Sequence, residues 1–133
     1  MIECMILGDN IAQGVARWRP QCAQITQPGV TTSSFNHRLT QSVDARHVLI
    51  SLGSHDVAVP DLSRHLTQIR LRVIHGEVTW LLSANNAQAA EQVQQIARSH
   101  GDRVIQVKVV VGPDGVHPSI SGYHRLNQMW LPL

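Results

Sequence analysis

Short apolar runs alternate along the chain with longer segments in which apolar residues recur every three to four positions. The apolar runs are typical of buried strands, and the periodic segments are typical of amphipathic helices. The predicted strands cover residues 2–7, 21–26, 46–52, 77–83 and 103–111. The predicted helices cover residues 11–18, 33–42, 62–74, 86–99 and 119–131.

Local signals mark several helix ends. Asp61 is a suitable N-cap for the helix over 62–74, and Gly76 is expected to end that helix. Gly101 is expected to end the helix over 86–99 in the same way. The alternation of strand and helix predicts an α/β fold with a parallel sheet and helices on both of its faces. A length of 133 residues predicts one domain over 1–133.

The composition excludes some classes of protein. Hydrophobic residues make up 43% of the chain and charged residues 15%, which is a globular composition and not a disordered one. A net charge of +2 without a run of basic residues argues against a nucleic-acid partner. No apolar stretch of about 18 residues is present, so neither a membrane span nor a membrane partner is predicted.

Two cysteines, Cys4 and Cys22, lie in apolar runs that predict strands. We expect them to be buried free thiols, because their spacing suggests neither a disulfide nor a metal site. No signal peptide is recognisable at the start of the sequence. The expected location is therefore the reducing cytoplasm, or a particle assembled there, such as a virion.

Most other large or basic side chains are expected to be structural. The tryptophans should pack in the core or between helices, and the arginines of the helices and the scattered histidines should lie on the surface. These residues are Trp18, Trp80, Trp130, Arg17, Arg19, Arg70, Arg72, His37, His47, His65, His75, His100 and His124.

Polar and glycine-rich residues follow the predicted strands. In an open parallel sheet, ligands bind beyond the carboxyl ends of the strands, so these residues predict a binding site at that edge. The segments are Gly8-Asp9-Asn10, Pro28-Gly29-Val30-Thr31-Thr32, Gly53-Ser54-His55-Asp56, Ala84-Asn85-Asn86 and Asp114-Gly115-Val116-His117-Pro118.

Four of these segments, in this order, resemble the sequence blocks of the SGNH (GDSL-type) hydrolase family. LGDNIAQG is similar to the block Gly-Asp-Ser-x-x-x-Gly, and PGVTT is similar to the second block, whose glycine donates to an oxyanion hole. SLGSHDV is similar to Gly-x-Asn-Asp, and DGVHPSISGY is similar to Asp-x-x-His-Pro. The resemblance implies an α/β, three-layer, flavodoxin-like fold with a central parallel sheet of about five strands in the order 2-1-3-4-5. It also implies serine-esterase chemistry that needs no cofactor.

The resemblance assigns roles to three residues. His117 would be the base that takes a proton from the nucleophile, Asp114 would orient it, and the Gly29 N–H would be an oxyanion donor. The plainer interpretation is that Asp114-Gly115 is only a β-turn and His117 only a residue before a helix.

Two positions depart from the family pattern. Asn10 stands where the nucleophilic serine is expected, and an amide cannot form an acyl-ester intermediate. His55 stands where an oxyanion-hole asparagine is expected, although one hydrogen bond from its ring could replace that donor in part. An introduced substitution would explain Asn10 alone, but His55 argues against that explanation.

The first hypothesis is therefore a degenerate, non-catalytic pseudoenzyme, a binding or structural module in which Asn10 is a helix N-cap. Its partner would be another protein or a second copy of the chain, and its ligand a carbohydrate or small ester. The alternative is an active esterase or deacetylase on small esters or acetylated carbohydrates, in which Asp114 and His117 activate water. Asp9 or Asp56 could then act as a second acid or base in the same crevice. No spacing resembles a zinc pattern, so no metal is predicted.

Overall fold

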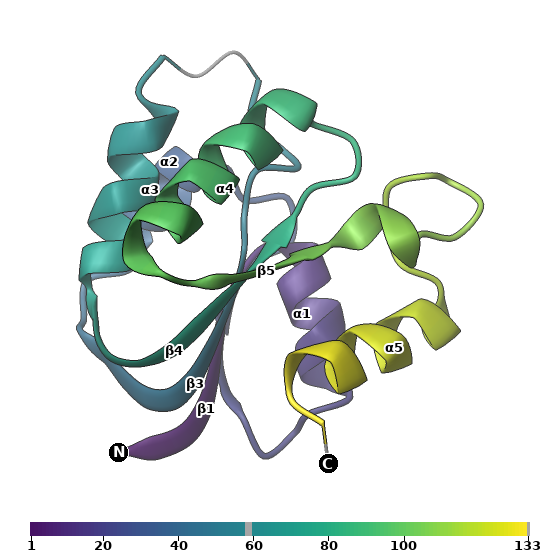
Figure 1. Ribbon diagram of the computed structural model, residues 1–133, viewed down its shortest axis with the longest axis horizontal. Helices are drawn as coiled ribbons and strands as arrows, with labels where there is room; N and C mark the ends of the chain where they lie inside the picture. Colours follow the sequence, from purple (N-terminus) through teal and green to yellow (C-terminus); the bar gives the residue numbers. More distant parts are fainter. Residues whose placement is uncertain (58–59, 133) are drawn as a thin grey trace.

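Five parallel strands form one sheet in the computed structural model, which describes residues 1–57 and 60–132 (Figure 1). The strand order is β2-β1-β3-β4-β5, so the predicted order and fold class are confirmed. The strands are β1 (Ile2–Gly8), β2 (Ala23–Thr26), β3 (Val43–Ser51), β4 (Val73–Leu82) and β5 (Arg103–Gln106).

Helices cover both faces of the sheet and complete the three layers. In Figure 1, α2, α3 and α4 lie on one side of the strands, and α1 and α5 lie on the other. Their bounds are α1 (Asn10–Arg17), α2 (Thr32–Arg38), α3 (Leu62–Leu71), α4 (Ala87–His100) and α5 (Ile120–Trp130), with one 3₁₀ turn, η1 (Val107–Val109).

The sheet divides the hydrophobic core into two clusters. Alternate residues of a strand point to opposite faces, so Val48 and Ile50 of β3 join the cluster under α2, α3 and α4, and Leu49 joins the cluster under α1 and α5. A strand that is buried on both faces has no polar side, which explains the continuous apolar runs of the sequence.

Several element bounds differ from the predictions, and two of the differences follow from particular residues. Gly76 does not end a helix: α3 ends at Leu71, and Gly76 lies within β4, where its φ of +116° and its close approach to the Ala45 carbonyl leave no room for a Cβ atom. The predicted strand over 103–111 ends at Gln106 and continues as η1. Gly101 ends α4 in the left-handed conformation, as predicted.

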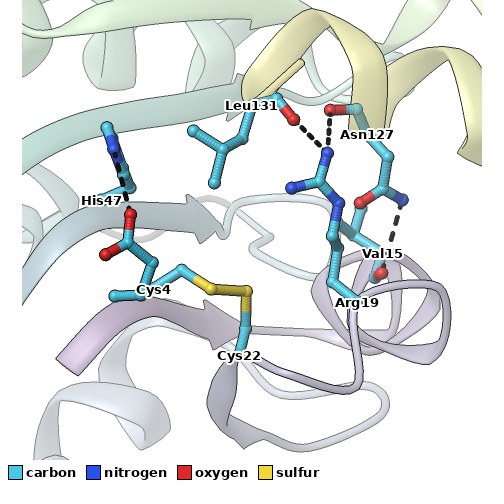
Figure 2. Close-up of a disulfide and its surroundings, with 8 residues drawn as sticks. Cys4, Val15, Arg19, Cys22, His47, Asn127 and Leu131 are labelled. Atoms are coloured by element: carbon cyan, nitrogen blue, oxygen red, sulfur yellow. Dashed lines mark hydrogen bonds and ion pairs between the residues drawn. A yellow bond between two sulfur atoms is a disulfide. The ribbon is translucent and has the colours of Figure 1, made fainter. Parts of the chain in front are cut away.

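A disulfide joins Cys4 of β1 to Cys22 (Figure 2), so the expectation of free thiols is wrong. Met5 pairs with Ala23 in the sheet, and this register places the two preceding residues, the cysteines, side by side with their Cα atoms 4.8 Å apart. Neighbouring strands are spaced about as far apart as the Cα atoms of a disulfide require. The cytoplasmic location stays a prediction, and the disulfide does not support it.

Arg19 is buried, contrary to the expectation of a solvated side chain. Its guanidinium donates hydrogen bonds to the backbone carbonyls of Asn127 (3.0 Å) and Leu131, as Figure 2 shows, and it lies 5.8 Å from the Trp130 ring centroid. Burial lowers the pKa of Arg19. The loop between α1 and β2 is therefore held to α5 by Arg19 and to β1 by the disulfide.

The surface prediction for His65 is also wrong. His65 is buried between α2 and α3, where its Nδ1 lies 2.9 Å from Asn36 Nδ2. Trp18 packs against a neighbouring helix, as predicted: its ring centroid lies 4.4 Å from that of His124 in α5, although the residue is 42% exposed.

The helices of the described residues are short. The longest, α4, has 14 residues, whereas a transmembrane helix needs about 20 apolar residues. Within residues 1–57 and 60–132, therefore, none has the length and apolar character that a membrane crossing requires.

Candidate functional site

Asp9 organises the turn between β1 and α1. Its Oδ1 accepts hydrogen bonds from the backbone N–H groups of Ile11 (3.0 Å) and Ala12 (3.3 Å) and from the Ser51 hydroxyl (2.9 Å). Asp9 is therefore the N-cap of α1, and the prediction that Asn10 is the cap is wrong because Asn10 is the first residue of the helix. Asp9 is fully buried, its Oδ2 accepts no hydrogen bond from the described residues, and desolvation raises its pKa.

The two residues that depart from the family pattern contact each other. His55 Nε2 lies 2.7 Å from Asn10 Oδ1, and both side chains are partly buried. An amide oxygen can only accept a hydrogen bond, so the ring nitrogen donates and carries the hydrogen. The sequence predicted that both residues lie at one edge of the sheet, but it did not predict this bond.

Asp114 and His117 form the second pair, in the loop between η1 and α5. Asp114 Oδ2 accepts a hydrogen bond from His117 Nδ1 at 2.7 Å, and Oδ1 accepts from the backbone N–H groups of Val116 (2.8 Å) and His117 (2.9 Å). The Val116 N–H, followed by the His117 side chain, lowers the pKa of Asp114 to about 2. Since Nδ1 carries the hydrogen, Nε2 of His117 is the nitrogen that could accept a proton.

Tyr123 lies near the first and the last motif segment and was not singled out from the sequence. It lies in the first turn of α5, and its ring packs so close to Gly14 of α1 that a Cβ atom there would overlap it. Burial, followed by the charges of Asp9 and Asp114, raises the pKa of its phenol. One side chain thus lies within electrostatic reach of both motif segments. The signal for it was the tyrosine of DGVHPSISGY together with the last glycine of LGDNIAQG.

Hydrogen bonds join the loop that contains Asp56 to the start of α2, which follows the loop that contains Gly29. Asp56 is buried and accepts hydrogen bonds from the Thr32 backbone N–H (2.8 Å) and hydroxyl (2.5 Å). Asn86 Nδ2 donates to the carbonyls of Gly53 (2.9 Å) and Asp56 (2.7 Å). These contacts give Asp56 a structural role at the start of α2. Gly29 lies in the loop before α2 with a φ of +73°, and its role as an oxyanion donor stays a prediction.

No protein-family model and no curated protein matches the chain. A candidate GDSL-like lipase from Bacteroides uniformis is similar in structure, with a TM-score of 0.71 at 12% identity over 97% of this chain and 94% of that chain. The chain has an SGNH hydrolase-like fold. A carbohydrate acetylesterase from Sinorhizobium meliloti has a TM-score of 0.61 at 11% identity, over 97% and 96% of the two chains. The C-terminal catalytic domain of peptidoglycan O-acetyltransferase A from Streptococcus pneumoniae has a TM-score of 0.60 at 14% identity, over 98% and 92%.

Within this SGNH hydrolase-like fold, the sequence-predicted residues separate into two groups. Asn10 with His55, and Asp114 with His117, form hydrogen-bonded pairs of partly exposed side chains. The buried carboxylates of Asp9 and Asp56 instead accept hydrogen bonds from backbone N–H groups and from hydroxyl groups. In the part of the chain that is described, no three side chains of His, Cys, Asp or Glu gather so that they could hold a metal ion.

Asp9→Asn is expected to make the stability of the chain less sensitive to pH. Because the folded-state pKa of Asp9 is raised above 3.8, its protonated form stabilises the fold below that pH, and the contribution is lost as the pH rises through the folded-state pKa. Asparagine keeps the accepting Oδ1 but cannot ionise. Urea unfolding of both proteins at several pH values measures the free energies of unfolding.

The free energy of unfolding of the wild type, relative to that of Asp9→Asn, should fall as the pH rises from about 4. Asp61→Asn is the matched control, since Asp61 precedes α3 but makes no capping hydrogen bond with its side chain. A difference between wild type and Asp9→Asn that stays constant with pH would contradict the prediction.

Proposed function

We propose that this SGNH hydrolase-like chain is a binding module that does not perform serine-esterase chemistry. The observation that supports this most strongly is the hydrogen bond between His55 Nε2 and Asn10 Oδ1. Asn10 occupies the nucleophile position with a group that cannot form an ester. The same bond engages the ring nitrogen with which His55 would otherwise donate to an oxyanion.

Each of these two losses is large. Removal of the nucleophile from a serine triad lowers the rate by about 10⁶-fold, and removal of one oxyanion donor lowers it by about 10²- to 10³-fold. Residual acceleration from binding alone is about 10³- to 10⁴-fold over water. Such a protein is better suited to holding a ligand than to converting it.

The proposed ligand is a small ester or an acetylated carbohydrate, or the product of its hydrolysis. One of the similar solved structures is a carbohydrate acetylesterase, which supports this class of ligand. A protein partner or a second copy of the chain is the other form that a binding module could take. A shift in molecular mass in solution on mixing would separate that case from small-molecule binding.

Wild-type protein is expected to hydrolyse an activated acetate ester no faster than a His117→Ala variant. The reason is that His117 has no hydroxyl to deprotonate at position 10. The measurement is the initial rate of release of the leaving group, with a buffer blank and equal protein concentrations. Turnover by the wild type that is lost in His117→Ala would overturn the proposal.

A second function is favoured by one specific observation, the bond between Asp114 and His117. This bond orients the ring and leaves Nε2 able to take a proton from water, which could then attack an ester directly. Hydrolysis by this route would depend on His117 and would proceed without an initial burst, because no acyl-enzyme accumulates.

A further inference from the structure

The hydrogen bond from His55 determines how the Asn10 amide is presented. Because His55 Nε2 donates to Oδ1, the other end of the amide, Nδ2, points away from the ring with two N–H donors. No described residue accepts a hydrogen bond from Nδ2. Asn10 also lies in the first turn of α1, where backbone N–H groups carry the partial positive charge of a helix start.

We propose that Asn10 has taken over the donor task of motif position 55, and that the Asn10–His55 pair binds a small carboxylate. The donor for the ligand oxygen is now the Asn10 amide, and His55 is a positioning residue that orients it. This inference rests on the proposed function, because it requires a site that holds its ligand without converting it. A serine at position 10 would make the same site catalytic. The inference deepens the proposed function by naming the ligand as the free acid rather than its ester.

The charges around the pair favour an anion. Asp114, the exposed carboxylate of the motif segments, already accepts three hydrogen bonds, so its charge is compensated within its own loop. The buried carboxyl of Asp9 faces Ser51 and the start of α1, and burial favours its neutral form. Neither group is left to repel a bound anion strongly.

A carboxylate has two oxygens, and two kinds of donor are available for them. Nδ2 of Asn10 can bind one oxygen, and the His117 ring, which Asp114 holds through Nδ1, can bind the other when its Nε2 carries a hydrogen. The packing of Tyr123 against Gly14 brings the first turn of α5, which follows His117 closely in sequence, onto α1. An ester or an amide, unlike a carboxylate, carries no negative charge and has no second anionic oxygen for these donors.

Acetate is the probe that tests this inference, with acetamide as its neutral counterpart. In two-dimensional NMR titrations at constant ionic strength, acetate should shift the side-chain amide resonances of Asn10 and saturate, and acetamide should not. Sodium chloride at the same ionic strength is the control for a general salt effect. Equal responses to acetate and acetamide, or no response at Asn10, would overturn the inference.

The role of His55 is tested by two substitutions and one spectroscopic measurement. His55→Leu removes the donor and should weaken acetate binding on the order of tenfold, and His55→Gln should recover most of that loss because its amide can donate to Asn10. His75→Leu, on the exposed amino-terminal part of β4, is the matched control. The ¹⁵N shifts of the wild-type ring should identify the tautomer with hydrogen on Nε2. Hydrogen on Nδ1 alone would contradict the role of His55 as the donor to Asn10, even if His55→Leu does not fold.

The outcomes separate this inference from the proposed function. Ester turnover by the wild type that depends on His117 would contradict the binding module, whatever acetate does. A wild type that does not hydrolyse the ester, and whose Asn10 resonances do not respond to acetate, would contradict the carboxylate site but not the binding module.

Discussion

Asn10→Ser is expected to give the chain an ester-hydrolase activity that, under the proposed function, the wild type lacks. The Asp114–His117 pair is already hydrogen bonded in the orientation that a base requires, so the serine hydroxyl is the group that the site lacks. The substitution also removes Oδ1 and frees Nε2 of His55 to donate elsewhere. The rate with an activated acetate ester should rise by on the order of 10²-fold or more, well short of a full triad because the oxyanion asparagine is still replaced.

Further variants locate the source of this gain. His117→Ala in the Asn10→Ser background should abolish the activity, and His55→Asn in the same background should raise it by about 10²-fold by restoring an amide donor. Asn85→Ser, an exposed substitution of the same type in the loop after β4, is the matched control. An Asn10→Ser protein that is folded but silent would mean that the site differs from an esterase in more than these two side chains.

The fold was predictable because its signals are local. Each strand between two helix layers must be apolar on both faces, and each helix must be apolar on one, so hydrophobic periodicity predicted the alternation and hence the parallel sheet. The end of β5 was less predictable. Val107 and Val110 are buried at a spacing of three residues, which suits a helical turn as well as a strand.

The sequence named candidate site residues, whose roles stay predictions, but it did not predict the contacts that these residues make. Motif spacing identified Asn10, His55, Asp114 and His117. It did not predict that the two substituted residues bond to each other, because that bond depends on how the loop after β3 turns over the start of α1. For the same reason the buried bonds of Asp56 to Thr32, across 24 residues of sequence, were not foreseen.

The prediction of free thiols was the largest error of the sequence interpretation. It arose because the sequence does not show the register in which β1 and β2 pair. The predicted strand order already made β1 and β2 neighbours. Only the pairing of Met5 with Ala23, however, shows that Cys4 faces Cys22. Disulfides persist in oxidising compartments, so this bond favours such a location over the reducing cytoplasm.

Replacing both cysteines by serine is expected to lower the free energy of unfolding by about 3 kcal/mol. The bond closes a loop with a sequence separation of 18 residues, and without it the unfolded chain gains conformational entropy. The folded chain also loses a tie on β2, a four-residue edge strand that pairs only with β1 and is partly exposed. Urea unfolding of the oxidised wild type, the reduced wild type and the Cys4→Ser, Cys22→Ser double variant measures this loss.

Loss of the disulfide should also affect the candidate site, because β2 leads into one of its loops. The strand continues directly into the loop that holds Gly29, so opening the disulfide should increase hydrogen exchange in that loop more than in α3 or α4, which pack on the far side of the sheet. The reduced wild type and the double variant should then behave alike, and reductant should leave the double variant unchanged. Alkylation of both cysteines in denatured, unreduced protein would contradict the bond itself. Equal stability of all three forms would mean that Arg19, through its bonds to the end of α5, is enough to hold this edge of the sheet.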